Sequence, residues 1–233
     1  MKISLLSILN FEAVSGASQG RSSDPGVMAF KDIMQQAYGQ PMDPNDDPTL
    51  FDMVTGTELP HGIVVASHIF QYRWRLYLPS FSSITDINDA RNGLFLYKPV
   101  EWAFDRAKLC IEVRGGDMFF RLLDPLAGLE TVKLTDKARE FKDIVRTPEI
   151  EAAEAHIEMT FGDLDGARLH IPPGSEVRPS KRLLTLHTYA SWLFATALSP
   201  NRDIPPPRCD YGPDEELDAL RDIVIQWRER LPE

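Results

Sequence analysis

The sequence of 233 residues predicts an α+β fold in a single compact domain, because a chain of this length has room for one sizeable hydrophobic core. Two patterns set the fold class. Residues 62–108 have the pattern of a strand, a loop, a second strand and a helix, and residues 109–123 have the pattern of a β-hairpin. The chain beyond the hairpin is mainly helical in pattern.

Residues 1–49 are predicted to be an N-terminal extension with one short helix. The apolar start of the chain is interrupted early by polar side chains, so we expect a first strand or helix there and not a secretory signal. Residues 13–27 are rich in Gly and Ser and favour a loop, and residues 27–39 favour a helix. Residues 41–48 combine Pro with acidic and amide side chains, which indicates a solvated linker.

Residues 50–125 are predicted to form the core of the domain. The β-branched run within residues 62–70 favours a strand, and residues 79–89 follow as a Ser- and Asp-rich connection. An Asn-Gly pair opens a second short strand at residues 92–98, and Pro99 suits the first turn of the next helix. The hairpin then completes this part, with two glycines at its turn.

Residues 126–233 are predicted to be a helical part packed on this core. Helical patterns cover residues 135–146, 147–161, 180–198 and 214–231. A proline-rich segment separates the last two patterns and cannot be helical. The last pattern has one apolar face, which favours packing on the domain over contact with a partner.

Composition argues against several classes of protein. No apolar run approaches the roughly 20 residues that cross a bilayer, so we expect no membrane span and an intracellular location in the cytoplasm or nucleus. Cys110 and Cys209 are the only cysteines, so we expect neither a disulfide framework nor a cysteine zinc site. The formal net charge of −10 disfavours nucleic acid as a partner. The oligomeric state stays open.

Four short segments occur in a characteristic order. They are VTG at residues 54–56, SHIF with His68, ARNGLFL with Asn92, and KPVEWAFD with Glu101 and Asp105. In order and spacing these segments resemble the fungal members of the HNH nuclease family. The resemblance covers about residues 50–125 and implies a ββα-metal (His-Me finger) core, extended here by the hairpin and several packed helices.

The resemblance implies a metal-dependent endonuclease, a hydrolase of phosphodiester bonds. In such a site the histidine that ends the first strand is the general base, which here is His68. The asparagine, here Asn92, fixes the loop and the orientation of the imidazole. The helix presents ligands to one divalent cation, and here Glu101 and Asp105 lie one turn apart. Their oxygen atoms favour Mg²⁺ or Mn²⁺.

Three positions depart from the family pattern. Relatives usually carry a histidine where this chain has Glu101, and often an acidic residue where it has Ser67. Asp52 stands where relatives often begin the motif with cysteine, which argues against a structural zinc. We therefore expect the site either to have changed its metal or to be metal-free.

Two functional hypotheses follow. In the first, the protein is a nuclease, and three basic side chains position the phosphate backbone: Arg73, Arg75 and Arg91. In the second, the nuclease scaffold has been co-opted as a cyclase or isomerase for an apolar small molecule in fungal secondary metabolism, or as a binding module. The small molecule would lie in a pocket rimmed by Tyr72, Trp74, Tyr77 and Trp102. Motif order favours the first hypothesis, and composition favours the second.

Each proposed site residue also has a purely structural interpretation. His68 suits a hydrogen-bonded core histidine, and Asn92 suits a turn. Glu101 and Asp105 suit helix positions that pair with neighbouring basic side chains, and Trp102 suits the core.

Overall fold

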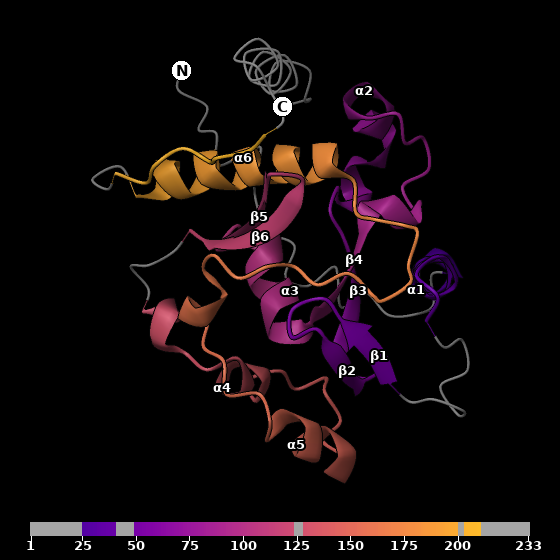
Figure 1. Cartoon of the computed structure of the whole chain (residues 1–233), viewed down its shortest axis with the longest axis vertical. Helices are drawn as coiled ribbons and strands as arrows, with labels where there is room; N and C mark the ends of the chain where they lie inside the picture. Colours follow the sequence, from indigo (N-terminus) through magenta and orange to yellow (C-terminus); the bar gives the residue numbers. More distant parts are fainter. Residues whose placement is uncertain (1–24, 41–48, 124–127, 200–202, 211–233) are drawn as a thin grey trace.

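A computed structural model describes residues 25–40, 49–123, 128–199 and 203–210 (Figure 1). The predicted N-terminal strand or helix, the linker at residues 41–48 and the C-terminal helix at residues 214–231 lie outside these residues. None of the described helices is long and apolar enough to span a membrane.

The described chain is a mixture of helices and small antiparallel sheets, which confirms the predicted α+β class. β1 (Thr49–Asp52) pairs with β2 (Thr57–Pro60), β3 (Val64–His68) with β4 (Gly93–Tyr97), and β5 (Leu109–Arg114) with β6 (Asp117–Leu122). Each pair is a separate two-stranded sheet. The sheets are therefore small hairpins, and the helices and loops cover them.

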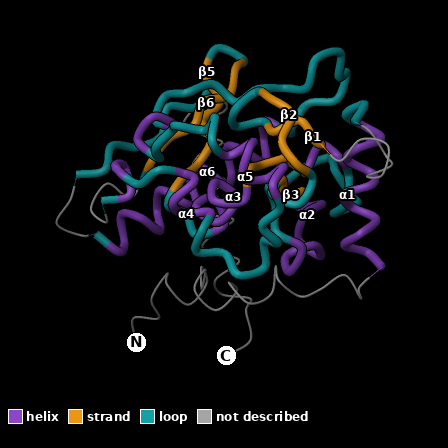
Figure 2. Tube along the Cα trace, turned by 90° about the horizontal axis from the view of Figure 1, so that it is seen from below, coloured by secondary structure: helices purple, strands orange, loops and turns teal. Residues whose placement is uncertain are grey.

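Within the described ranges, six α-helices accompany the hairpins. They are α1 (Pro25–Ala37), α2 (Leu78–Phe81), α3 (Lys98–Asp105), α4 (Leu134–Ala138), α5 (Pro148–Glu154) and α6 (Lys181–Leu198). Short 3₁₀ helices occur at Tyr72–Tyr77, Ala90–Asn92, Leu129–Thr131 and Gly162–Leu164. Figures 1 and 2 both place α1 beside β3 and α4 on the opposite side of the molecule.

The predicted helices at residues 135–146 and 147–161 are too long. α4 ends at Ala138 and α5 ends at Glu154. Residues 159–161 instead lie against residues 132–134, with hydrogen bonds from Leu134 N to the Met159 carbonyl and from Phe161 N to the Val132 carbonyl. At residues 159–161 these long-range backbone bonds take the place of the hydrogen bonds that a continued helix would need.

The hairpin of β1 and β2 was not predicted, and a buried aspartate holds it. Asp52 accepts hydrogen bonds from the backbone N–H and the hydroxyl of Thr55, both at 2.9 Å, and from the backbone N–H of Tyr97 at 2.7 Å. Burial raises the pKa of Asp52 to about 6, although these hydrogen bonds act in the other direction. Asp52 therefore links the first hairpin to the end of β4.

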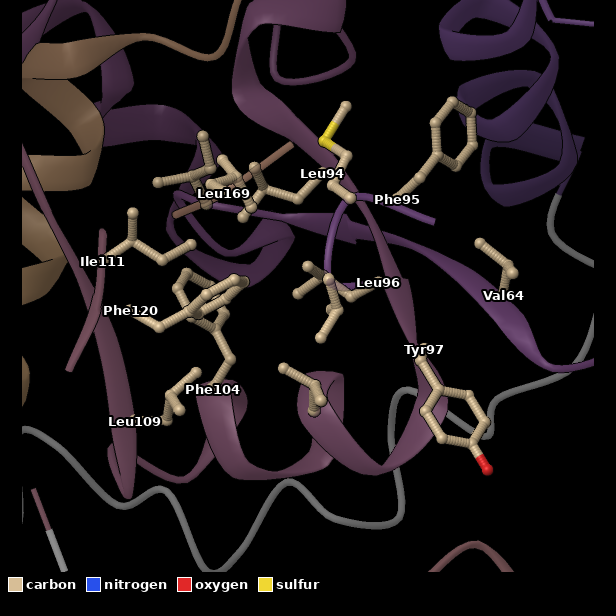
Figure 3. Packing of buried hydrophobic residues seen from close by; sticks show 14 of the residues in the cluster. Val64, Leu94, Phe95, Leu96, Tyr97, Phe104, Leu109, Ile111, Phe120 and Leu169 are labelled. Atoms are coloured by element: carbon tan, nitrogen blue, oxygen red, sulfur yellow. The ribbon is translucent and has the colours of Figure 1, made fainter. Parts of the chain in front are cut away.

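β4 is the centre of the core, and all five of its residues are buried. Figure 3 shows Leu94 and Leu96 directed toward Phe104 and Phe120, while Phe95 and Tyr97 point the other way. This alternation is that of a strand with apolar neighbours on both faces. The segments before and after β4 are consequently held at two defined places in the molecule.

α1 packs against the start of β4 so closely that Gly93 leaves no room for a side chain. A Cβ at Gly93 would lie 2.2 Å from Met34 Sδ and 2.9 Å from Phe30 Cζ. Both of these residues belong to α1 and are buried. Gly93 therefore permits the contact between α1 and the β3–β4 hairpin.

We expect Gly93→Ala to lower the free energy of unfolding by about 2 kcal/mol, because overpacking displaces α1 or the strand. Urea denaturation measures this change. Gly62→Ala is the matched control, since a Cβ there meets Ile150 at 3.7 Å, an ordinary contact, and should change stability by less than about 0.5 kcal/mol. Equal effects of the two substitutions would contradict the packing argument.

Candidate functional site

His68 ends β3 and lies opposite Gly93, the first residue of β4. Its Nε2 is 3.2 Å from the side-chain oxygen of Asn88. One face of the imidazole stacks on Phe30 of α1, with ring centroids 3.7 Å apart and planes inclined by 10°, and Tyr72 lies at 6.2 Å. The ring is therefore held by an amide and by two aromatic neighbours.

The surroundings of His68 keep the imidazole neutral. Burial lowers its pKa to about 4, and the hydrogen bond with Asn88 acts in the opposite direction. Because an amide oxygen can only accept, Nε2 carries the proton in this contact, and Nδ1 is the remaining acceptor. A neutral imidazole has the right form for a general base, but a pKa this low makes it a weak one.

Asn92 is fully buried, and its side chain joins two loops. Its Oδ1 accepts from the backbone N–H of Phe70 at 2.8 Å, and its Nδ2 donates to the carbonyls of Phe70 at 3.1 Å and Ile87 at 2.9 Å. Its own carbonyl accepts from Ile69 N at 2.8 Å. Asn92 therefore fixes the chain that follows His68.

His68 and Asn92 thus lie at the same end of the β3–β4 hairpin, as their positions in the motif predict. Their side chains have different partners, because Asn92 binds backbone groups while Asn88 contacts the imidazole. Asn88 and Phe30 are the two site neighbours that the sequence analysis missed. Nothing in the local pattern of either residue indicates that it contacts His68.

Glu101 and Asp105 belong to α3, which begins where β4 ends. His68 instead pairs with the first residue of β4. Figure 3 shows α3 crossing beside the Tyr97 end of β4 toward Leu109. The carboxyl pair and the imidazole are therefore positioned from opposite ends of the same strand.

The two carboxyl groups interact mainly with each other. Burial raises the pKa of Glu101 well above its ordinary value, and the charge of Asp105 and a hydrogen bond with it add to this effect. The charges of Lys98 and Arg106 act in the opposite direction. Burial and the neighbouring Asp105 therefore both favour the protonated form of Glu101.

This pair does not fit the divalent cation that the family resemblance implies. A carboxylate must be deprotonated to bind a metal ion, and a cation at Glu101 would have to overcome the burial and the Asp105 charge that raise its pKa. Within the described ranges, no group of three or more His, Cys, Asp or Glu side chains is arranged to hold a metal ion. That part of the chain includes His68, Glu101 and Asp105.

The predicted substrate-binding residues lie in two separate neighbourhoods. Near His68, Arg75 lies 4.8 Å above the ring of Tyr72, and Arg91 forms a 2.6 Å ion pair with Asp89. Arg73 and Trp74 belong to the 3₁₀ helix at Tyr72–Tyr77, but their side chains lie outside the description, as does that of Tyr77.

Trp102 belongs to a different contact, between α3 and α4. The ammonium group of Lys137 lies 3.9 Å from the centre of its ring, and the guanidinium of Arg106 lies at 5.1 Å. Tyr72 instead contacts His68. The contacts of Tyr72 and Trp102 therefore give no support to a single pocket rimmed by both residues.

Residues 52–112 match a family model described as HNH endonuclease. The match starts at Asp52, covers β3, β4 and α3, and ends within β5. It supports an HNH-family domain in this part of the chain. No curated protein and no solved structure matches the chain.

We expect Asn92→Ala to lower the free energy of unfolding by about 3 kcal/mol, because it leaves three buried backbone groups of Phe70 and Ile87 without partners. Urea denaturation measures the loss. Asn88→Ala is the control, because it removes one contact at a partly exposed position and should cost less than about 1 kcal/mol. A smaller loss for Asn92→Ala than for its control would contradict the role of Asn92 in holding the two loops.

The raised pKa of Glu101 predicts a pH dependence of stability. Because the pKa of Glu101 is higher in the folded state than in the unfolded chain, its stabilising effect is complete below the unfolded pKa and is lost as pH rises toward the folded pKa. Glu101→Gln cannot ionise. Its melting temperature should therefore fall less than that of the wild type between about pH 5 and about pH 8.

The exposed Glu151→Gln serves as the control for this measurement and should follow the wild type. A Glu101→Gln profile parallel to the wild type would mean that Glu101 is ionised in the folded protein. It would then be available as a metal ligand.

Proposed function

We propose that residues 52–112 form an HNH-type domain that has lost metal-dependent nuclease activity, and that the protein acts by binding. In this proposal β3, β4 and α3 are the ββα unit of the family. The burial of Glu101 beside Asp105 carries the proposal, because Glu101 occupies the helix position that supplies a metal ligand in relatives and burial favours its uncharged form.

The environment of His68 supports the same conclusion. A general base must reach a water molecule beside the scissile bond. Here Phe30 covers one face of the imidazole, and Nε2 is engaged by Asn88. Since α1 is also packed tightly on Gly93, uncovering the ring would require a displacement of this helix. The arrangement is suited to holding a neutral histidine in place as part of the framework.

The charge of the chain is a third support. A formal net charge of −10 repels a polyanionic backbone, which a nuclease must approach closely. Near His68, Arg91 is already paired with Asp89 at 2.6 Å, which reduces the positive charge available to a phosphate. A ligand other than nucleic acid is therefore favoured.

Nuclease activity is the second candidate, favoured by the family match and by the place of His68 and Asn92 at one end of the hairpin. It requires Phe30 to leave the imidazole and a cation to be held by ligands beyond the Glu101–Asp105 pair. The cyclase or isomerase activity predicted from the sequence has no described contact in its favour.

The two candidates predict opposite results in a cleavage assay. We expect no cleavage of supercoiled plasmid, single-stranded DNA or RNA in Mg²⁺ or Mn²⁺ that exceeds the level in chelator, because the described carboxyl groups do not form a cation site. His68→Ala should give the same result as the wild type. Metal-dependent cleavage that is abolished in His68→Ala would overturn the proposal.

Phe30→Ala adds a second test to this assay, because it removes the ring that covers His68. If Phe30→Ala gains metal-dependent cleavage that the double variant with His68→Ala lacks, the site is a covered nuclease and the proposal is wrong. If Phe30→Ala stays inactive while circular dichroism shows that it is folded, the loss of the metal site is sufficient to explain inactivity.

A further inference from the structure

A cleft lies between the β5–β6 hairpin and the segment that follows α6. It has a volume of about 240 Å³, and its walls include both charged and apolar residues. The charged residues are Glu112, Arg114, Arg121, Asp165 and Arg208. None of these residues contacts His68 or the Glu101–Asp105 pair in the interactions described above, so the cleft is a separate site.

The ion pair between Arg121 and Glu112 holds one wall of this cleft in place. Arg121 donates from Nη1 to Glu112 at 2.7 Å and from Nη2 to the carbonyl of Pro205. The backbone N–H of Arg208 donates to the same Glu112 oxygen at 3.1 Å. Glu112 is buried, and its charge is matched by Arg121 at 2.7 Å and by the longer ion pair with Arg114 at 3.5 Å. The pair also fastens residues 205–208 to the hairpin.

Two further arginines in the cleft keep unused donors. Arg114 lies 4.4 Å above the ring of Phe119, and its Nε forms a 3.5 Å ion pair with Glu112 but no hydrogen bond. Among the residues that the structure describes, no hydrogen bond engages the terminal nitrogens of Arg114 or the guanidinium of Arg208. These two groups therefore have donors available for a ligand.

The cleft also has a surplus of positive charge. Three arginines face two carboxylates, and one of these, Glu112, is matched by Arg121. The other, Asp165, accepts a hydrogen bond from Leu122 N at 2.9 Å. Such a surplus on a chain with a net charge of −10 marks a site for a small anion, because an extended polyanion would meet the acidic surface around it.

We propose that this cleft binds a small phosphomonoester, with the guanidinium groups of Arg114 and Arg208 on the phosphate oxygens. A guanidinium fork matches two phosphate oxygens at once, and two forks suit a dianion better than a single carboxylate. The remainder of the ligand contacts the apolar part of the wall, which Phe120, Pro205 and Pro206 form. The volume of the cleft suits a small molecule.

Isothermal titration calorimetry with phenyl phosphate tests this proposal on the full chain at constant ionic strength. We expect saturable binding to one site below about 10 mM, and weaker binding of malonate, a dicarboxylate of similar charge. Arg114→Ala and Arg208→Ala should each weaken the binding of phenyl phosphate about tenfold, because each removes a charged donor pair. Arg208→Lys should lose less, since it keeps the charge.

The matched control is Arg139→Ala, which removes an exposed arginine of α4 that pairs with Asp136 away from the cleft. It should leave binding unchanged, and thermal melts should show that all variants are folded. No saturable binding, equal binding of malonate, or an equal loss in Arg139→Ala would each overturn the proposal. Because none of these variants changes His68, Glu101 or Asp105, the outcome is independent of the nuclease assay.

Discussion

Complete burial of β4 is the constraint on which the rest of this structure depends. A buried strand must satisfy its backbone groups and surround both rows of its side chains. β3 and the Asp52 region provide hydrogen-bond partners, since Met53 N donates to the Phe95 carbonyl and Tyr97 N donates to Asp52. The start and the end of β4 thereby become two fixed points, and every candidate site residue in the family match is positioned from one of them.

The two fixed points separate the parts of the family motif, and no group of metal ligands brings these parts together among the described residues. At the start of β4, Asn92 holds the chain that follows His68, and Gly93 admits α1 against the imidazole. At the end of β4, α3 presents Glu101 and Asp105. Burial of Glu101 and the charge of Asp105 both favour the protonated form of Glu101, and the described residues offer this pair no third acidic, histidine or cysteine ligand for a cation. The framework of an HNH domain is thus compatible with a site that has lost its chemistry.

The acidic net charge of the chain and the positive charge of the arginine cleft act on anions of different size. General repulsion of polyanions and local attraction of a small anion are compatible, because screening limits each interaction to roughly 10 Å. Arg121 and Glu112 hold the wall, while the terminal nitrogens of Arg114 and the guanidinium of Arg208 keep donors available among the described residues. The arginine groups that remain available attract a small ligand, while the acidic charge of the rest of the chain repels nucleic acid. The cleft is therefore expected to select the small ligand.

The sequence by itself determined the elements whose signals are local. The β-branched run of β3, the Asn-Gly pair before β4, Pro99 in the first turn of α3 and the glycines of the β5–β6 turn each lie beside the element that they predict. The order of His68, Asn92 and Glu101 likewise indicated the family. Only the tertiary structure decided where α4 and α5 end, that β1 and β2 form a hairpin, and that Phe30 and Asn88 enclose His68. The reason is that these features depend on contacts between residues far apart in the chain, for which hydrophobic periodicity and capping signals carry no information.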